Sequence, residues 1–176
     1  MTNRTALIWI LGGLAAMLVI GRRKGNAPAI GGTPLRREPT ADKLHRKIQE
    51  FIDEVRGQEL TEEQRKIYSV FAGEQNVTEI KVQDILKIYD TFKVQKGNLY
   101  FGTRHILYKH YNARNSSVTA NDILNMCEII KDSMPMCDIK TRKHYYEVNQ
   151  NGKQYKLVID WKEKAGSANL ITFYTK

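Results

Sequence analysis

Residues 143–161, which read KHYYEVNQNGKQYKLVIDW, decide the fold. Two runs rich in tyrosine, valine and isoleucine flank Asn151-Gly152, and Asn-Gly between such runs is the strongest short-range signal of a β-hairpin. A turn at this pair fixes the register of both strands. The register places three pairs opposite one another on an apolar face: Val148 with Tyr155, Tyr146 with Leu157, and His144 with Ile159. The other face then carries Tyr145, Glu147, Lys156 and Val158.

A third strand is predicted after the hairpin. A turn rich in Lys, Gly and Ser over 162–169 leads to an apolar run over 170–174. Side chains alternate along a strand, so two sets are expected on opposite faces: Leu170, Thr172 and Tyr174 on one, and Ile171 and Phe173 on the other. The three strands together predict an antiparallel meander.

Helices are predicted just before the meander. Residues 98–102 indicate a short strand, and Thr103 is expected to cap a helix over 103–111. Thr119 and Asp122 form a capping box that opens the next helix. Residues 96–176 therefore predict an α+β module in which helices pack on a small antiparallel sheet.

The middle of the chain, residues 40–95, is predicted to be helical. Apolar residues at helical spacing line one face of the first helix, which ends near Gly57: Leu44, Ile48, Phe51, Ile52 and Val55. Thr61 and Gln64 form a capping box that opens a second helix, which runs through Phe71. A third amphipathic helix is expected from about Val82 to Phe92.

Residues 1–24 are predicted to form a membrane anchor. The run 5–21 has no charged residue, and at ~1.5 Å per residue it spans about 25 Å as a transmembrane helix. The basic residues at 22–24 follow the run, so the remainder is expected on the cytoplasmic side of the membrane. A cleaved signal peptide with a site near 27–29 and a buried core helix are the alternatives. Residues 25–39, rich in Gly, Pro and Arg, predict a flexible linker.

Charge is unevenly distributed along the 176 residues, whose formal net charge is +9. Residues 96–176 hold 13 basic and 7 acidic side chains, whereas residues 40–95 hold 9 and 11. A basic module favours a polyanionic partner such as RNA or another nucleic acid. A solvated, lysine-bearing surface is the alternative.

Cysteine and histidine are too few for a metal cluster or a disulfide scaffold. The chain has two cysteines and four histidines. On a helix, His105 and Lys109 share a face, whereas His105 and His110 are about 140° apart around the axis and are poorly placed to bind one metal. Cys127 is expected in the core. The sequence thus predicts neither a metal nor a cofactor.

Several short motifs occur in a characteristic order within residues 80–176. They are the His-Ile-x-x-x-His run at 105–110, the pair Ile129-Ile130, the tyrosine-rich hairpin at 145–161 and the strand at 171–174. In this order the chain resembles the phage branch of the barnase/EndoU/colicin/RelE-like nuclease superfamily. The resemblance implies a membrane-tethered or virion-associated ribonuclease that cleaves RNA without a metal at a site on the sheet. It also implies other virion proteins or an immunity protein as partners.

The chemistry of such cleavage indicates which residues would take part. A base must remove the 2′-hydroxyl proton, an acid must protonate the leaving 5′-oxygen, and cations must stabilise the phosphorane. Histidine can play either proton role, and the sequence does not decide which histidine is the base. The candidate catalytic residues are His105, His110, Lys109, Thr172 and Tyr174. The candidate substrate-binding residues are Arg104, Arg142 and Tyr146.

A non-catalytic function fits the same features. An anchor, a tether and a small basic domain also suit a minor virion or membrane structural protein that binds nucleic acid or protein. The two functions differ in whether His105 or His110 shares a site with Thr172 and Tyr174.

Overall fold

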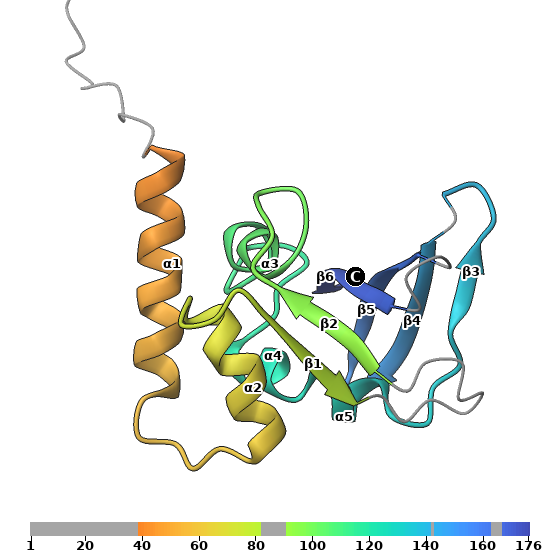
Figure 1. Cartoon of the computed structure of the whole chain (residues 1–176), viewed down its shortest axis with the longest axis horizontal. Helices are drawn as coiled ribbons and strands as arrows, with labels where there is room; N and C mark the ends of the chain where they lie inside the picture. Colours follow the sequence, from red (N-terminus) through yellow and green to blue (C-terminus); the bar gives the residue numbers. More distant parts are fainter. Residues whose placement is uncertain (1–38, 82–90, 142, 163–166) are drawn as a thin grey trace, which may run out of the picture. The chain divides into compact units, whose positions relative to one another are not determined.

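The computed structural model describes residues 39–81, 91–141, 143–162 and 167–176, along which two helices, two strands, three helices and four strands follow one another (Figure 1). The helices are α1 (Thr40–Val55), α2 (Glu62–Phe71), α3 (Thr103–Lys109), α4 (Ala120–Leu124) and α5 (Met126–Ile130). The strands are β1 (Val77–Lys81), β2 (Thr91–Gln95), β3 (Met136–Asp138), β4 (Lys143–Gln150), β5 (Lys153–Lys162) and β6 (Ser167–Thr175). All of them belong to one unit, Arg37–Lys176.

The predicted hairpin is confirmed in both turn and register. Asn151 and Gly152 have φ values of 51° and 73°, which is the backbone conformation that a two-residue type I′ turn requires. The three apolar pairs form as expected, with Tyr146 opposite Leu157 at the centre. The hairpin therefore fixes which side chains of β4 and β5 face the core.

The sheet is larger than predicted and mixed. Its order is β1-β2-β6-β5-β4-β3, and β2 pairs with β6 in parallel, through Phe92 opposite Ala168 and Lys93 opposite Asn169. The other pairs are antiparallel. The prediction of a purely helical middle and a small antiparallel sheet is therefore wrong, because β1 and β2 extend the sheet beyond the C-terminal meander.

Two predicted elements are replaced by others. Residues 82–90 of the third helix lie outside the described residues, but its last two expected members, Thr91 and Phe92, belong to β2. Residues 98–102 form a loop rather than a strand, closed by the Asn98 N–H donating to the Phe101 carbonyl at 2.9 Å. Gly102, not Thr103, is the N-cap residue of α3.

The predicted fold class also included a transmembrane helix, and this is corrected. Among the described residues, no helix is both long enough and apolar enough to cross a bilayer. The run 5–21, on which the prediction rested, lies outside the described residues. Localisation stays a prediction from the sequence.

A β-bulge corrects the predicted alternation of β6. Val158 pairs with Thr172 and Ile159 pairs with Leu170, so Ile171 is an extra residue with no partner on β5. The bulge puts Leu170 and Phe173 together in the core and leaves Thr172 and Tyr174 on the opposite face. The expectation that Leu170 shares a face with Thr172 is therefore wrong.

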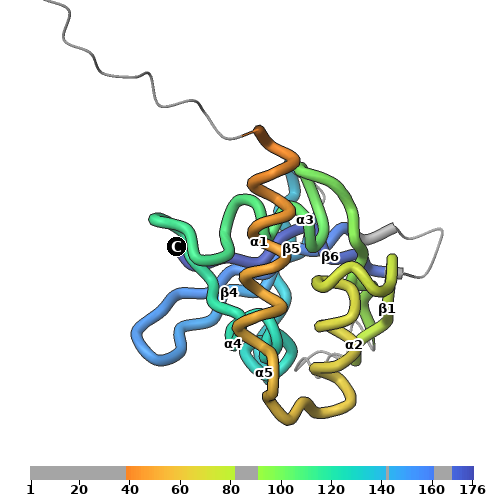
Figure 2. The backbone as a smooth tube through the Cα atoms, turned by 90° about the vertical axis from the view of Figure 1, so that its left-hand side faces the viewer, coloured from red at the N-terminus to blue at the C-terminus, as the bar shows by residue number. Residues whose placement is uncertain are grey.

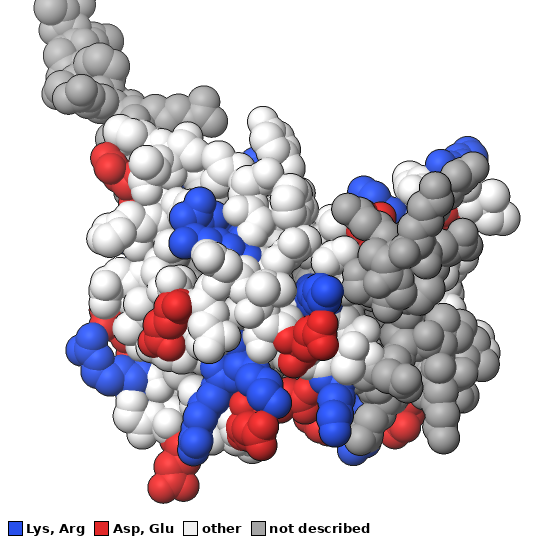
Figure 3. Space-filling model, in the orientation of Figure 1, with Lys and Arg blue, Asp and Glu red and all other residues white. Residues whose placement is uncertain are grey.

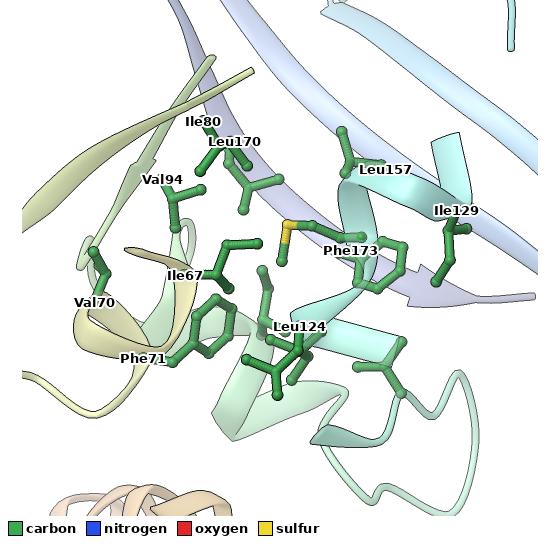
Figure 4. Packing of buried hydrophobic residues seen from close by; sticks show 14 of the residues in the cluster. Ile67, Val70, Phe71, Ile80, Val94, Leu124, Ile129, Leu157, Leu170 and Phe173 are labelled. Carbon is green, nitrogen blue, oxygen red and sulfur yellow. The ribbon is translucent and has the colours of Figure 1, made fainter. Parts of the chain in front are cut away.

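The core lies between one face of the sheet and the helices. Side chains of α2, α4 and α5 pack against the buried side chains of the strands, among them Leu157, Leu170 and Phe173 (Figure 4). Helix α1 covers α3 and α4 (Figure 2), where Phe51 meets the Tyr111 ring edge-on at 5.8 Å between centroids. The Tyr111 hydroxyl donates to the Glu54 carboxylate at 2.5 Å.

Both predicted capping boxes are confirmed, and the second one joins α4 to the hairpin. The buried carboxylate of Asp122 accepts hydrogen bonds from the Thr119 N–H at 2.9 Å, the Tyr155 hydroxyl at 2.8 Å and the Lys153 ammonium at 3.0 Å. Burial alone would raise the pKa of Asp122, but these partners lower it below its ordinary value. The fold therefore stabilises the charged form of Asp122.

Candidate active site

The sheet has a polar face opposite the core, formed by β4, β5 and β6. We define this polar face by six side chains that alternate with buried ones: Tyr145, Glu147, Lys156, Val158, Thr172 and Tyr174. Glu147 pairs with Lys156, and Lys156 pairs in turn with Tyr174. The face was expected for β4 and β5 from the register of the hairpin, and the bulge adds the two residues of β6.

The loop over residues 97–102 links the polar face to α3. Its Gly102 N–H donates to the carbonyl of the bulged Ile171 at 2.9 Å. Gly97 and Gly102 both have positive φ, and a Cβ on Gly102 would lie 2.6 Å from the Gln95 carbonyl oxygen. Only glycine fits such a close backbone approach without displacement. The loop is therefore held tightly against β2 and β6.

Two histidines meet beside Tyr174. The rings of His105 and His110 are 5.2 Å apart between centroids, and the His110 ring stacks on that of Tyr174 at 5.0 Å and 20°. The helical spacing argument placed the two histidines far apart. It fails because His110 is the C-cap of α3, with φ −119° and ψ −27°, and no longer follows the helix.

A backbone carbonyl of the loop orients His105. Its Nδ1 lies 2.8 Å from the Leu99 carbonyl oxygen. A carbonyl can only accept, so Nδ1 carries the proton in the neutral ring, which leaves Nε2 as the lone-pair nitrogen. Such an imidazole is oriented to accept a proton at Nε2.

His110 is held neutral. Burial, followed by the neighbouring His105, lowers its pKa from 6.5 to about 4, against an opposing backbone hydrogen bond to Ser116. Its Nδ1 is buried and has no hydrogen-bond partner among the described residues. At neutral pH this ring is therefore an uncharged support for Tyr174 rather than a proton donor.

Lys156, the strand partner of Tyr174, adds a positive charge to the site. The Lys156 ammonium lies 2.9 Å from Glu147 and 3.8 Å from the centroid of the Tyr145 ring. Burial disfavours the charged form of Lys156, but the hydrogen bond and charge of Glu147 outweigh burial and raise the pKa of the lysine. Lys176 also binds Glu147, at 2.6 Å. Charges of both signs thus adjoin Tyr174.

The sequence-predicted site residues divide into those that meet and those that do not. His105, His110 and Tyr174 are in contact, and Thr172 lies on the same face, with a buried hydroxyl that has no partner among the described residues. Arg104 is half-buried on α3, and its Nε is likewise buried without a described partner.

The remaining predicted residues lie elsewhere. Lys109 is exposed, with its ammonium 5.4 Å from the centroid of the Tyr108 ring. Tyr146 is 0% exposed, in the core, and Arg142 lies outside the described residues. Lys156, Tyr145 and Glu147 were not among the predicted site residues, although the hairpin register had already placed them together on one face.

The grouping of metal ligands and the charge of the surface limit what the described residues can bind. Among the described residues, no three His, Cys, Asp or Glu side chains are grouped to hold a metal ion. The surface in Figure 3 carries both signs over α2 and β1, where Glu62 pairs with Lys66 at 2.8 Å and Glu79 with Lys93 at 3.6 Å. That surface has no single-sign patch to attract a polyanion.

Comparison with known proteins adds no relative. Neither a protein-family model nor a curated protein matches the chain. The geometry of the polar face and of the histidines beside it is therefore what supports a function for the chain.

Proposed function

We propose that the protein is a ribonuclease that cleaves RNA by attack of the 2′-hydroxyl group, with no metal needed for the proton transfers. The observation that carries the proposal is the contact series from His105 through His110 to Tyr174, with Lys156 as the strand partner of Tyr174. The series brings a proton acceptor, a phenol and a cation to one face of a sheet. The resemblance to the phage branch of the nuclease superfamily supports the same reaction class.

His105 is assigned the role of general base. Its Nδ1–H is engaged by the Leu99 carbonyl, so its Nε2 is the atom that accepts the 2′-hydroxyl proton. The 2′-oxygen then forms a bond to phosphorus while the bond from phosphorus to the 5′-oxygen breaks. Positioned proton transfer of this kind contributes typically ~10²–10⁴-fold in rate.

Tyr174 is assigned the role of general acid, and Lys156 that of the phosphate-binding cation. The Tyr174 hydroxyl gives its proton to the leaving 5′-oxygen, and the protonated His105 returns a proton to the phenolate through water. The charged Lys156 stabilises the negative phosphorane. The products are a 2′,3′-cyclic phosphate and a 5′-hydroxyl group.

His110 is assigned as a positioning residue. It stacks on Tyr174 at 5.0 Å and its lowered pKa keeps it neutral. It thus fixes the phenol without adding charge. His110→Phe is expected to retain much more activity than His110→Ala, because a planar ring can still stack on Tyr174.

The experiment is a cleavage assay of the full chain on a mixed-sequence RNA, with and without chelator. We expect the wild type to cleave in both conditions. His105→Ala and Tyr174→Phe should each lower the rate by ~10²-fold or more. His45→Ala, at an exposed histidine of α1, is the matched control and should leave the rate unchanged.

Two outcomes contradict the proposal. Wild-type protein that cleaves neither RNA nor DNA would remove the enzyme hypothesis and favour the non-catalytic binding protein. Cleavage that chelator abolishes would mean that a metal, rather than His105, activates the nucleophile.

A further inference from the structure

Helices α1 and α3 bring three basic side chains together around one tyrosine ring. The Lys43 ammonium of α1 lies 4.2 Å from the centroid of the Tyr108 ring, and the Lys109 ammonium lies 5.4 Å from the same centroid. Arg104 precedes Tyr108 by four residues on α3, so these two share one face of that helix. We define the α1–α3 surface by these four residues. Figure 3 shows basic side chains gathered where α1 lies beside α3 in Figure 1.

The three cations of the α1–α3 surface have no acidic partner in the part of the chain that the structure describes. No carboxylate there forms an ion pair with Lys43, Arg104 or Lys109. By contrast, Lys47 on the next turn of α1 binds Glu50 at 3.0 Å. An aromatic ring attracts an ammonium group through its quadrupole but carries no net charge. The tyrosine therefore positions two ammonium groups and leaves their charge available to an anion.

Such an arrangement is unfavourable without an anion. The ammonium groups of Lys43 and Lys109 flank one ring, so they lie no more than about 10 Å apart, which is one Debye length at 0.1 M salt, and they repel each other. The Nε of Arg104 is buried and finds no hydrogen-bond partner among the described residues, and an unpartnered buried donor destabilises a fold. Asp42 is the acidic neighbour of Lys43 in the sequence, but the three cations outnumber it. A bound anion would relieve both the repulsion and the unpartnered donor.

The α1–α3 surface adjoins the candidate active site around α3. Successive residues of an α-helix are about 100° apart around its axis. His105 and Lys109 therefore lie on one face of α3, and Arg104 and Tyr108 lie on the next. The His105 ring contacts the His110 ring of the site. An extended anion bound at the active site can thus continue over Lys109 onto the α1–α3 surface.

We propose that the α1–α3 surface binds backbone phosphates of the RNA away from the cleaved bond, so that the protein acts on chains long enough to reach from the sheet to α1. Lysine and arginine bind phosphate through charge-assisted hydrogen bonds, which fix the position of a nucleic acid without reading its sequence. Lys43 belongs to α1, outside the residues 80–176 that carry the resemblance to the nuclease superfamily. This inference rests on the proposed function, so binding is measured separately from cleavage.

The probe is a fluorescent 2′-O-methyl RNA dodecanucleotide of mixed sequence, which binds without being cut because the attacking hydroxyl is blocked. Fluorescence anisotropy gives its affinity for the full chain between about 50 mM and 200 mM salt. Each phosphate contact to a single strand adds about 0.7 to the slope of log affinity against log salt. The triple variant Lys43→Gln, Arg104→Gln, Lys109→Gln should lower that slope by about 2 and weaken binding roughly a hundredfold at 0.1 M salt.

The matched control removes three positive charges elsewhere. Its changes are Arg56→Gln, Lys66→Gln and Lys131→Gln, at cations that are paired with carboxylates. The net charge falls by the same amount as in the triple variant of the α1–α3 surface. Because distant surface charges are screened by salt, the control should weaken binding by less than about threefold.

Two further variants keep the test valid if the half-buried Arg104 is needed for folding. Lys43→Gln with Lys109→Gln leaves Arg104 in place and should lower the salt slope by about 1.4. Tyr108→Leu removes the ring but no charge, so it should weaken binding severalfold and keep the slope. The Tm of each variant, measured by circular dichroism, identifies any variant that fails to fold.

The outcomes distinguish the two proposals. A triple variant that binds as tightly as its matched control, or that keeps the wild-type salt slope, overturns the α1–α3 surface. Normal probe binding by the triple variant together with wild-type cleavage of RNA refutes the surface and leaves the ribonuclease. Loss of probe binding in the triple variant, with a wild type that cuts no RNA, upholds the surface and refutes the ribonuclease.

Discussion

Replacing Asp122 tests how strongly one buried carboxylate holds α4 to the hairpin. The Asp122→Ala variant loses the side-chain half of a capping box with Thr119, which is worth about 1 kcal/mol. It also leaves the hydroxyl of Tyr155, which now donates to Asp122 at 2.8 Å, without a partner in a buried position, at a cost of about 1–3 kcal/mol. The free energy of unfolding should therefore fall by roughly 3 kcal/mol.

The assay is thermal unfolding followed by circular dichroism. A domain of this size loses about 3–4 °C in Tm per kcal/mol, so Asp122→Ala should unfold about 10 °C below the wild type. Tyr155→Phe removes the hydroxyl without stranding it and keeps the bonds of Asp122 to Thr119 and Lys153. It should therefore cost only ~1 kcal/mol.

The control is Asp53→Ala, at an exposed aspartate of α1, whose Tm should stay within about 1–2 °C of the wild type. Lowering the pH of the wild type should reduce its stability for the same reason as Asp122→Ala does. Because the folded-state pKa of Asp122 is lowered, its contribution is present above the unfolded-state pKa and is lost as the pH falls through the folded-state value. A Tm decrease of less than about 3 °C for Asp122→Ala would mean that this carboxylate does not hold α4 to the hairpin. A larger Tm decrease for Tyr155→Phe than for Asp122→Ala would mean the same.

Three further predictions concern the turn, the loop and the buried histidine. Gly152→Ala should lower the free energy of unfolding by about 1–2 kcal/mol because of the positive φ alone, since nothing lies within 4 Å of a Cβ added there. Gly102→Ala should lower it more in urea unfolding, because the added Cβ would lie 2.6 Å from the Gln95 carbonyl oxygen. Equal losses for the two variants would contradict the close approach. For His110, the unfolded chain binds a proton between pH 6.5 and about 4 while the folded chain does not. Stability should therefore fall as the pH is lowered through this window, and His110→Gln should flatten that part of the profile.

The hairpin and the capping boxes could be predicted because each depends on neighbouring residues. Asn151-Gly152 determines its own turn geometry, and the alternation of the flanking strands then determines the register. Thr61 with Gln64 is likewise a local pattern that the structure reproduces. The same local rules are sufficient to place Lys156 on the polar face, opposite Glu147.

The remaining features depend on distant contacts or on local departures from regular geometry. Strand β2 pairs in parallel with β6, about seventy residues later, through Phe92 and Lys93, and no local pattern encodes such a partner. The bulge at Ile171 shifts the alternation of β6 by one residue. His110 meets His105 because it lies just past the end of α3, where ideal helical angles no longer apply. The contact of His110 with His105 and Tyr174 therefore could not be predicted from the sequence.

The ribonuclease proposal is tested most directly by the chemical identity of the RNA ends that the full chain leaves in the presence of chelator. We expect 2′,3′-cyclic phosphate and 5′-hydroxyl ends from the wild type, loss of cleavage in His105→Ala, and unchanged cleavage in His45→Ala, as the proposal requires. Ends that carry a 5′-phosphate, or cleavage that persists in His105→Ala, would contradict it.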